Sequence, residues 1–331
     1  MQFLNQYGLF LSETITLVIA ILLIVAGVTA ILTRGKREQQ LTIKKLNAKY
    51  KNIEEALKAE ILDKKTLKQT LKQEKRKKTK GKTPSIQKRR VFVLNFHGDI
   101  RASAVESLRR EISAILTIAS SKDEIVINLE SGGGLVHSYG LAASQLQRIR
   151  DKKIHLTVCI DKIAASGGYL MACVANQILA APFAIIGSIG VVMQLPNLNR
   201  LLKKHNVEYE MLTSGDYKRT LTVFGENTEQ GRKKCQEDLE NIHKAFKDYI
   251  LQHRPQVNIE EVSTGEHWLA NKAADLKLVD GLITSDDYLM QACQDHDVFV
   301  VNYEKKKTLS EKLSGSLGKI YQDLMETTIK A

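Results

Sequence analysis

Apolar and polar positions divide the chain into an apolar N-terminal stretch, a polar middle and a C-terminal part of alternating short apolar runs and amphipathic segments. Residues 15–32 contain no charged side chain, and 18 residues at about 1.5 Å each nearly match a hydrocarbon core of roughly 30 Å. We therefore interpret residues 15–33 as a transmembrane anchor after a short segment at 1–14. A cleaved signal peptide is the alternative, but a basic leading region and a small-residue cleavage site are missing.

The segment after the apolar stretch is rich in lysine. Residues 34–90 hold 21 Lys/Arg against 6 Asp/Glu, so they carry a charge of +15, and the rest of the chain carries −3 of the net +12. Between 36 and 82 the apolar residues recur with loosely helical spacing, which predicts an exposed or self-associating helix. We treat 34–90 as a basic helical linker.

The most basic run, EKRKKTKGKTPS at 74–85, contains Gly81 and Pro84 and is typical of a flexible joint. A solvated linker is our first interpretation, and contact with anionic membrane lipids is the second. Nucleic-acid binding is disfavoured because no aromatic side chains interleave the charges for base stacking.

After residue 90 the pattern changes to β-branched apolar runs that alternate with amphipathic segments. Strands are predicted at 91–96, 124–129, 154–160 and 177–181, and helices at 135–150, 167–174 and 228–253. Such alternation is typical of an α/β domain with a parallel sheet, in which the loops at the strand ends carry the chemistry. We place this domain at 91–300, followed by a polar tail at 301–331.

Cysteine usage gives no sign of a metal site or a disulfide framework. Cys159, Cys173, Cys235 and Cys293 are scattered and have no CxxC or Cys/His spacing. We expect buried, reduced thiols and neither a cofactor nor a metal, and we regard thiol catalysis as a weaker alternative.

Three Gly/Ser-rich segments follow predicted strands: ESGGG at 130–134, DKIAASGGY at 161–169 and GSIGVV at 187–192. In such loops backbone N–H groups are free to point at a ligand. Ser166 stands on the small-residue turn AASGG, which would expose its hydroxyl next to the N–H of Gly167. A serine nucleophile needs this access and a donor where negative charge develops. A closely packed turn without chemistry explains the same pentapeptide.

Two kinds of base have the right chemistry to activate Ser166. His97 follows a strand, but a half-buried histidine bonded to backbone is the simpler interpretation of it. Lys218, in a loop of Gly, Tyr, Thr and Phe, acts as a base only where its surroundings favour the neutral amine. By itself, Lys218 is more typical of a surface cation.

Several long motifs agree in order and spacing with one known family. DKIAASGGY, GSIGVV, GDYKRTLTVFGENTEQGR and GEHWLANKAADLKLVDGL resemble the SohB branch of the signal peptide peptidase A family. The resemblance covers about residues 91–290. It implies the Clp/crotonase-like superfold and a serine peptidase that hydrolyses peptide bonds through an acyl-enzyme.

Carried over by resemblance, the nucleophile falls on Ser166 and its lysine base on Lys218. The oxyanion donors fall on the N–H groups of Gly133 and Gly167, and Ser188 matches a serine that orients the lysine. The turn ESGGG has a glycine at position 132 where the family usually has proline, which loosens the turn around Gly133.

The resemblance also implies partners and a location. Short apolar or signal-peptide-derived peptides are the expected substrates, membrane lipids surround the anchor, and copies of the chain form a homo-oligomer with shared active sites. The family places the catalytic domain in the periplasm, on the bacterial inner membrane. The Lys/Arg excess after the apolar stretch instead favours the cytoplasmic side.

Two rival functions stay open at this point. A catalytically silent relative would act as a membrane scaffold, although Ser166, Lys218 and Ser188 are all present. A crotonase-type acyl-CoA enzyme would use paired loop N–H groups on a thioester, but a distinct Glu/Asp pair near these loops is missing.

Overall fold

The computed structural model describes residues 2–33, 40–63, 65–66, 69 and 88–304. The chain forms two compact units, one made of residues 1–42 and 303–331 and the other of residues 43–302, which we call the central unit. The strands are β1 (Gln40–Lys45), β2 (Arg90–Gly98), β3 (Glu124–Ser131), β4 (His155–Ile160), β5 (Ile163–Ala165), β6 (Gln177–Ala180), β7 (Ile185–Gly187), β8 (His267–Leu269), β9 (Gly281–Leu282) and β10 (Asp297–Glu304). The helices are α1 (Gln2–Thr33), α2 (Leu46–Ile61), α4 (Val105–Leu116), α5 (Val136–Asp151), α6 (Gly167–Ala172), α7 (Asn199–Lys204), α8 (Glu229–His253), α9 (Ile259–Val262), α10 (Ala270–Asp275) and α11 (Ser285–Asp295).

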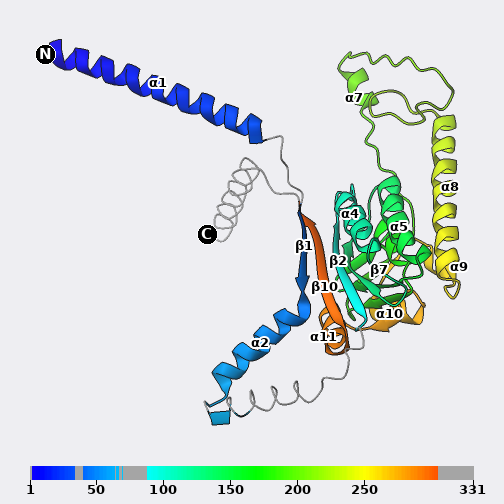
Figure 1. Cartoon of the computed structure of the whole chain (residues 1–331). Helices are drawn as coiled ribbons and strands as arrows, with labels where there is room; N and C mark the ends of the chain where they lie inside the picture. Colours follow the sequence, from blue (N-terminus) through cyan, green and yellow to red (C-terminus); the bar gives the residue numbers. More distant parts are fainter. Residues whose placement is uncertain (1, 34–39, 64, 67–68, 70–87, 305–331) are drawn as a thin grey trace, which may run out of the picture. The chain divides into compact units, whose positions relative to one another are not determined.

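The strands form one sheet in the order β1-β10-β2-β3-β4-β6-β9, and β5, β7 and β8 extend it as a branch from β3 (Figure 1). The described registers of β10 with β2, β2 with β3, β3 with β4 and β4 with β6 are all parallel. Strand β8 pairs antiparallel with β7. The predicted α/β class with a largely parallel sheet is therefore confirmed.

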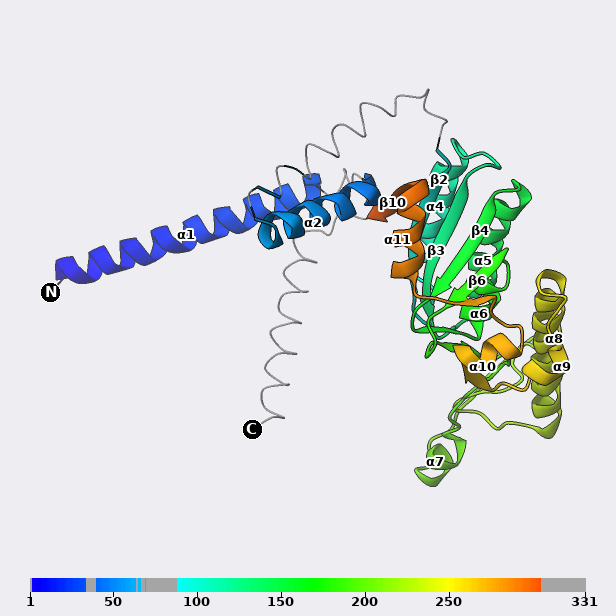
Figure 2. The same cartoon turned by 90° about the horizontal axis from the view of Figure 1, so that it is seen from below.

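Helices cover both faces of the sheet, as Figures 1 and 2 show. Side chains on a strand alternate between the two faces, so every second residue of β2 and β3 points to each layer. One layer is a buried cluster in which Leu289 of α11 and Leu46 pack on the sheet residues Val91, Val93, Val126, Cys159, Leu179 and Val298. The opposite face is covered by α4, α5 and α6 (Figure 2).

The main predicted elements of the domain are confirmed with small shifts at their ends. The four predicted strands correspond to β2, β3, β4 and β6, and the predicted helices correspond to α5, α6 and α8. The short strands β5, β7, β8 and β9 were not predicted, because two or three residues do not establish a period.

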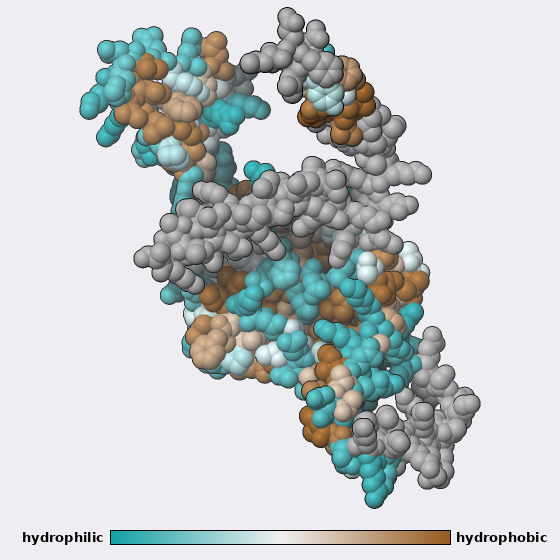
Figure 3. Space-filling view, turned by 90° about the vertical axis from the view of Figure 1, so that its left-hand side faces the viewer, coloured by the Kyte–Doolittle hydropathy of each residue, from teal (hydrophilic) through white to brown (hydrophobic). Residues whose placement is uncertain are grey.

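On the face shown in Figure 3, hydrophilic side chains are interspersed with smaller apolar patches.

The predicted helix over 36–82 is wrong at its beginning. Residues 40–45 form β1, which is a neighbour of β10 in the sheet, and the helix α2 begins only at Leu46. The alternation of Leu41 and Ile43 with polar residues suits an edge strand, and helical spacing does not distinguish the two over six residues. The basic run at 74–85 and most of the tail at 301–331 lie outside the described residues.

The side chain of Asn47 fastens the beginning of α2 to the end of α11. Its amide nitrogen donates to the carbonyls of Cys293 at 2.9 Å and His296 at 2.8 Å, and its oxygen accepts from the N–H of Val298 at 2.8 Å. The beginning of α2 is therefore fastened to the sheet domain, and the bounds of a linker at 34–90 stay a prediction.

The residues predicted to form a membrane anchor, 15–33, belong to the helix α1. In the part of the chain that the structure describes, no helix meets the length and apolarity needed to cross a membrane. The anchor is therefore not confirmed and stays a prediction.

A buried ion pair ties the beginnings of β2 and β3 together. The guanidinium of Arg90 contacts both carboxylate oxygens of Asp123, at 3.0 and 2.6 Å, and Asp123 is only 3% exposed. Burial on its own raises the pKa of Asp123, but hydrogen bonds from Arg90 and Ser120 outweigh it and hold this pKa at about 2.

We expect Asp123→Asn to lower the free energy of unfolding by about 2 kcal/mol at pH 7. Because the folded-state pKa is depressed, this contribution is complete above the unfolded-state pKa of about 4 and is lost as the pH falls toward 2. Urea unfolding should be measured between about pH 5 and about pH 2. The difference in unfolding free energy between wild type and Asp123→Asn should shrink over this range. The exposed Asp295→Asn serves as control, and a difference for Asp123→Asn that is independent of pH would contradict the prediction.

Candidate active site

Ser166 lies on the turn between β5 and α6 and has an unusual backbone. Its φ is +52° and its ψ is −119°, a region that few residues other than glycine adopt. Two hydrogen bonds fix this conformation: the Ser166 N–H donates to the Gly187 carbonyl at 2.8 Å, and its own carbonyl accepts from the Leu170 N–H at 3.0 Å. Among the described residues, its half-buried hydroxyl has no hydrogen-bond partner. A strained strand-to-helix turn of this kind presents a serine hydroxyl to a ligand.

Gly133 lies directly against this turn. A Cβ at Gly133 would lie 2.7 Å from the backbone nitrogen of Gly167 and 2.8 Å from the Cβ of Ser166. The φ of Gly133 is +89°, so both the conformation and the close approach require glycine. The structure therefore brings Ser166, Gly133 and Gly167 together, as the sequence predicted.

A chain of buried hydroxyl groups holds the Gly133 turn. The N–H of Gly133 donates to Oγ of Ser131 at 3.0 Å, and Ser131 Oγ lies 2.5 Å from the hydroxyl of Tyr139, which donates to the Asp99 carbonyl at 2.8 Å. Ser131 is 2% exposed and Tyr139 is fully buried, and this burial raises the pKa of Tyr139. The hydroxyl chain therefore stays neutral near pH 7 and acts through hydrogen bonds alone.

Tyr139 also packs its ring under the other turn. A Cβ at Gly167 would lie 2.5 Å from the Cγ of Tyr139, so the ring fills the space that glycine leaves. Neither Tyr139 nor Ser131 was singled out from the sequence. The first residue of the ESGGG turn could have been a signal, but Tyr139 reads as an ordinary core position of an amphipathic helix.

An apolar pocket of about 410 Å³ opens beside Ser166. Its walls are α5 and α8, and Ser166 and Gly167 lie at its edge together with Gly134, the residue after Gly133. The remaining lining residues are mostly apolar: Val136, Tyr139, Gly140, Ala143, Ser144, Leu170, Gly190, Val191, Ile242, Ala245, Phe246 and Tyr249. If a peptide bound with its carbonyl group at Ser166, the peptide side chain next to that carbonyl would therefore point into this apolar pocket.

Ser188 follows β7 on a turn that supports the nucleophile turn. Its φ is +50°, and its N–H donates to the Glu266 carbonyl at 2.6 Å. The preceding residue, Gly187, accepts the hydrogen bond from Ser166, and Gly190 lines the pocket. The GSIGVV segment thus reaches the site, as predicted.

Lys218 lies on a long segment of the central unit, residues 191–228, between β7 and α8. We call this segment the arm; it includes α7 and extends away from the sheet in Figure 1. Lys218 is exposed, and among the described residues its amine has no hydrogen bond or ion pair. A single copy of the chain does not join Lys218 to Ser166.

The arm has internal order but lacks a core. The side chain of Asn197 donates to the carbonyls of Thr222 and Gly225, and the side chain of Asn199 donates to the carbonyl of Phe224. These hydrogen bonds join the outgoing part of the arm to the returning part near the beginning of α7. Large apolar side chains along it remain exposed: Val192, Met193, Leu195, Leu198, Leu201, Val207, Tyr209, Met211, Leu212, Tyr217 and Phe224. A run of exposed apolar residues of this kind marks an interaction surface.

The other candidates from the sequence do not meet Ser166. His97 has a side chain that is 74% exposed and pairs with Glu130 at 3.6 Å. All four cysteines are free, and burial raises the pKa of Cys159 to about 12, which keeps that thiol protonated. Within the described ranges, no group of three His, Cys, Asp or Glu side chains is arranged to hold a metal ion.

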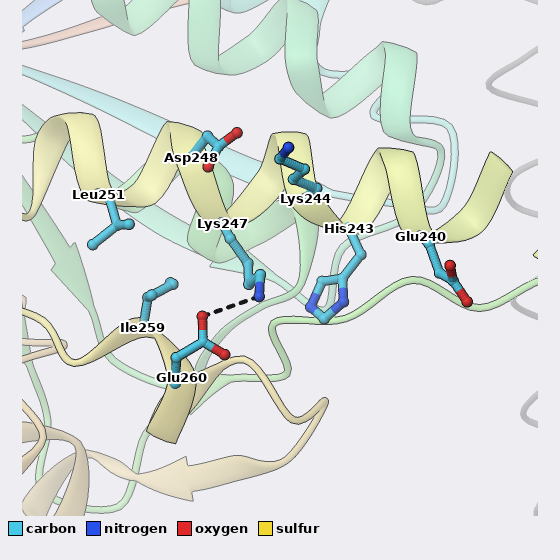
Figure 4. A pocket seen from close by; sticks show the side chains of 8 residues that line it. All are labelled: Glu240, His243, Lys244, Lys247, Asp248, Leu251, Ile259 and Glu260. Carbon is cyan, nitrogen blue, oxygen red and sulfur yellow. Dashed lines mark hydrogen bonds and ion pairs between the residues drawn. The ribbon is translucent and has the colours of Figure 1, made fainter. Parts of the chain in front are cut away.

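A second pocket, of about 450 Å³, lies between α8 and α9 (Figure 4). Its lining is mainly charged, and Lys247 reaches Glu260 at 3.2 Å across it. The imidazole Nε2 of His243 is buried there without a hydrogen-bond partner among the described residues. The pocket contains neither a serine nor any predicted site residue, so the chemistry belongs to the pocket beside Ser166.

Comparison with known proteins adds a family and relatives. Residues 2–146 match the N-terminal part of peptidase family S49, and residues 148–298 match peptidase family S49. The chain is 46% identical to the probable protease SohB of Haemophilus influenzae, over 93% of this chain and 91% of that protein. It is 45% identical to the probable protease SohB of Buchnera aphidicola subsp. Acyrthosiphon pisum, over 100% of this chain and 98% of that protein.

Solved structures show weaker likeness. A mutant of the 1510-N membrane-bound stomatin-specific protease in complex with a substrate peptide aligns with a TM-score of 0.44 at 16% identity, over 70% of this chain and 98% of that one. A mutant of ClpP1 from Listeria monocytogenes aligns with a TM-score of 0.39 at 16% identity, over 61% of this chain and 94% of that one.

The hydroxyl chain predicts a specific effect of Tyr139→Phe. The ring would still pack under Gly167, but Ser131 and the Asp99 carbonyl would each lose a buried partner, so we expect the free energy of unfolding to fall by about 1–2 kcal/mol. Hydrogen exchange of the backbone amides at 131–134 should become faster than in wild type. Unchanged exchange at these amides would show that the hydroxyl does not hold the turn.

Proposed function

The chain belongs to peptidase family S49 and is a serine peptidase, and we propose that it cuts peptide bonds with Ser166 as nucleophile and Lys218 as general base. The observation that carries this assignment is the close approach of Gly133 and Gly167 around Ser166 at the edge of an apolar pocket. The largely parallel sheet and the order of the glycine-rich turns support the finer assignment to the Clp/crotonase-like superfold.

The proposed reaction has two halves. The Lys218 amine takes the proton of the Ser166 hydroxyl, and the oxygen attacks the peptide carbonyl to give a tetrahedral oxyanion. The ammonium then gives its proton to the leaving amine as the C–N bond breaks, which leaves an ester on Ser166. The same amine then takes a proton from water, and the resulting hydroxide attacks the ester carbonyl. As the acyl C–O bond breaks, the ammonium returns this proton to the Ser166 oxygen, which releases the carboxylic acid product and restores the free serine. Ser188 follows Gly187, whose carbonyl accepts the hydrogen bond from the Ser166 N–H, and its side chain would orient the Lys218 amine.

Backbone N–H groups of Gly133 and Gly167 would stabilise the oxyanion. In the free chain the Gly133 N–H donates to Ser131, so it must turn toward the substrate or share its proton. Gly134 on the same turn borders the pocket and offers a neighbouring N–H. The looser turn expected from glycine at position 132 suits such an adjustment.

The lysine is best supplied by a neighbouring copy of the chain. An amine acts as a base only in its neutral form, which a covered apolar setting favours, and Lys218 is exposed on an arm whose apolar side chains lack cover. Docking of the arm onto a second copy would cover both. This arrangement makes the active form a homo-oligomer with shared active sites.

The pocket favours peptides with an apolar side chain next to the cleaved bond. Its two helical walls carry aliphatic and aromatic residues and no charged side chain. Short apolar peptides, including fragments of cleaved signal peptides, fit this chemistry. We also propose that residues 15–33 anchor the chain in the bacterial inner membrane among lipids, with the catalytic domain in the periplasm.

The shared site predicts complementation between two inactive variants. We expect Ser166→Ala and Lys218→Ala each to lower kcat/KM for an apolar peptide by about 10⁴-fold or more, because each removes one member of the dyad. Coexpression of the two variants, followed by purification on a different tag on each, should restore on the order of a quarter of wild-type activity if subunits mix randomly.

Lys204→Ala, on the same arm, is the matched control and should keep wild-type activity. Full activity of either single dyad variant would refute the dyad. A mixed sample as inactive as its two components would show that Lys218 does not act on a neighbour.

A further inference from the structure

The pocket beside Ser166 is formed by two helical faces. From α5 it is lined by residues 136, 139, 140, 143 and 144, and from α8 by residues 242, 245, 246 and 249, spacings of three and four that place each set on one side of its helix. Leu170 of α6 contributes between them. The side chains that these two helical faces project into the pocket therefore set the largest substrate side chain that it can accept.

Gly140 differs from the other glycines at the site. A Cβ at Gly134 would lie 2.1 Å from the Ile100 carbonyl oxygen, and one at Gly168 would lie 2.5 Å from the Ser131 carbonyl oxygen, so the backbone packing requires both. A Cβ at Gly140 would meet nothing within 4 Å. No contact in the described chain needs the absence of a side chain at position 140.

Glycine at this position also has a cost. Gly140 lies inside the 16-residue helix α5, where glycine is less favourable than alanine by about 1 kcal/mol. Its φ does not fall in the left-handed region that would favour glycine. The only feature of Gly140 that alanine would change, apart from helix stability, is the free space of the pocket.

We infer that Gly140 determines specificity: the missing side chain keeps the pocket deep enough for a large apolar residue, such as leucine or phenylalanine, directly before the cleaved bond. This inference rests on the proposed function, because it takes Ser166 as the nucleophile. A volume of about 410 Å³ lies in the lower part of the range of roughly 300–1,000 Å³ for ligand pockets. A methyl group at position 140 would narrow it without displacing any neighbour.

The test uses the full-length, detergent-solubilised protein and peptides that differ only in the residue before the cleaved bond: alanine, leucine or phenylalanine. Gly140→Ala should lower the ratio of kcat/KM for phenylalanine over alanine by about tenfold, and Gly140→Leu by about 100-fold, since a group that no longer fits costs 10–200-fold. Both variants should retain labelling of Ser166 by a small fluorophosphonate. Gly140→Ala should also unfold at a higher temperature than wild type.

His137→Leu is the matched control, because it adds the same side chain to the same helix outside the pocket. It should keep the wild-type preference. An unchanged preference in both Gly140 variants overturns the inference, as does loss of the oligomer or of thermal stability in Gly140→Ala, which would assign the glycine to packing. Wild-type protein that cleaves none of the peptides and resists the fluorophosphonate would instead refute the proposed function.

Discussion

The contact between two backbone turns, where Gly133 lies against Gly167, is the constraint on which the candidate site depends. Neither position has room for a Cβ, because Gly133 approaches the nitrogen of Gly167 and Gly167 rests on the ring of Tyr139. The turns come from different strands, β3 and β5, which are paired in parallel at Ser131 and Ala164. The parallel sheet thus delivers both turns to the same edge, and glycine lets them close on Ser166.

Two adjacent residues of α5, Tyr139 and Gly140, have different roles at this edge of the sheet. Tyr139 is buried between the pocket and the core, and its ring supports the Gly167 turn while its hydroxyl reaches the Gly133 turn through Ser131. Gly140 faces the pocket and leaves it open. The same helix therefore supports the turns around Ser166 and borders the pocket beside it. Under the proposed function, this arrangement would link the efficiency of the reaction to its selectivity.

The contrast between the packed α/β sheet and the exposed arm links the proposed chemistry to assembly. In one copy Ser166, Gly133 and Gly167 already lie together, whereas the Lys218 amine stands on the arm without a partner among the described residues. If the base comes from a second copy, a free chain holds an unactivated serine. Such a peptidase would be active only once assembled, which protects other peptides from a stray monomer.

Sequence reasoning predicted the parts of this structure that repeat or carry a motif. The long strands and helices of the domain followed from their periods. The glycine-rich turns at strand ends drew attention to Ser166 and Gly167, and the resemblance to a known family added Gly133. It did not predict β1, because six residues do not separate a strand from a helix, and it missed Tyr139, whose importance comes from contacts with residues far along the chain. Gly140 escaped notice because only the three-dimensional structure shows that the space beside it is empty.

The central claim is that Ser166 is the nucleophile. The most direct measurement is to treat the assembled wild-type protein with a fluorophosphonate and to map the modified residue by mass spectrometry of its peptides. We expect one stoichiometric adduct on Ser166 and none when Ser166 is replaced by alanine. An adduct on a different serine, or the absence of any adduct from protein that cleaves peptides, would contradict it.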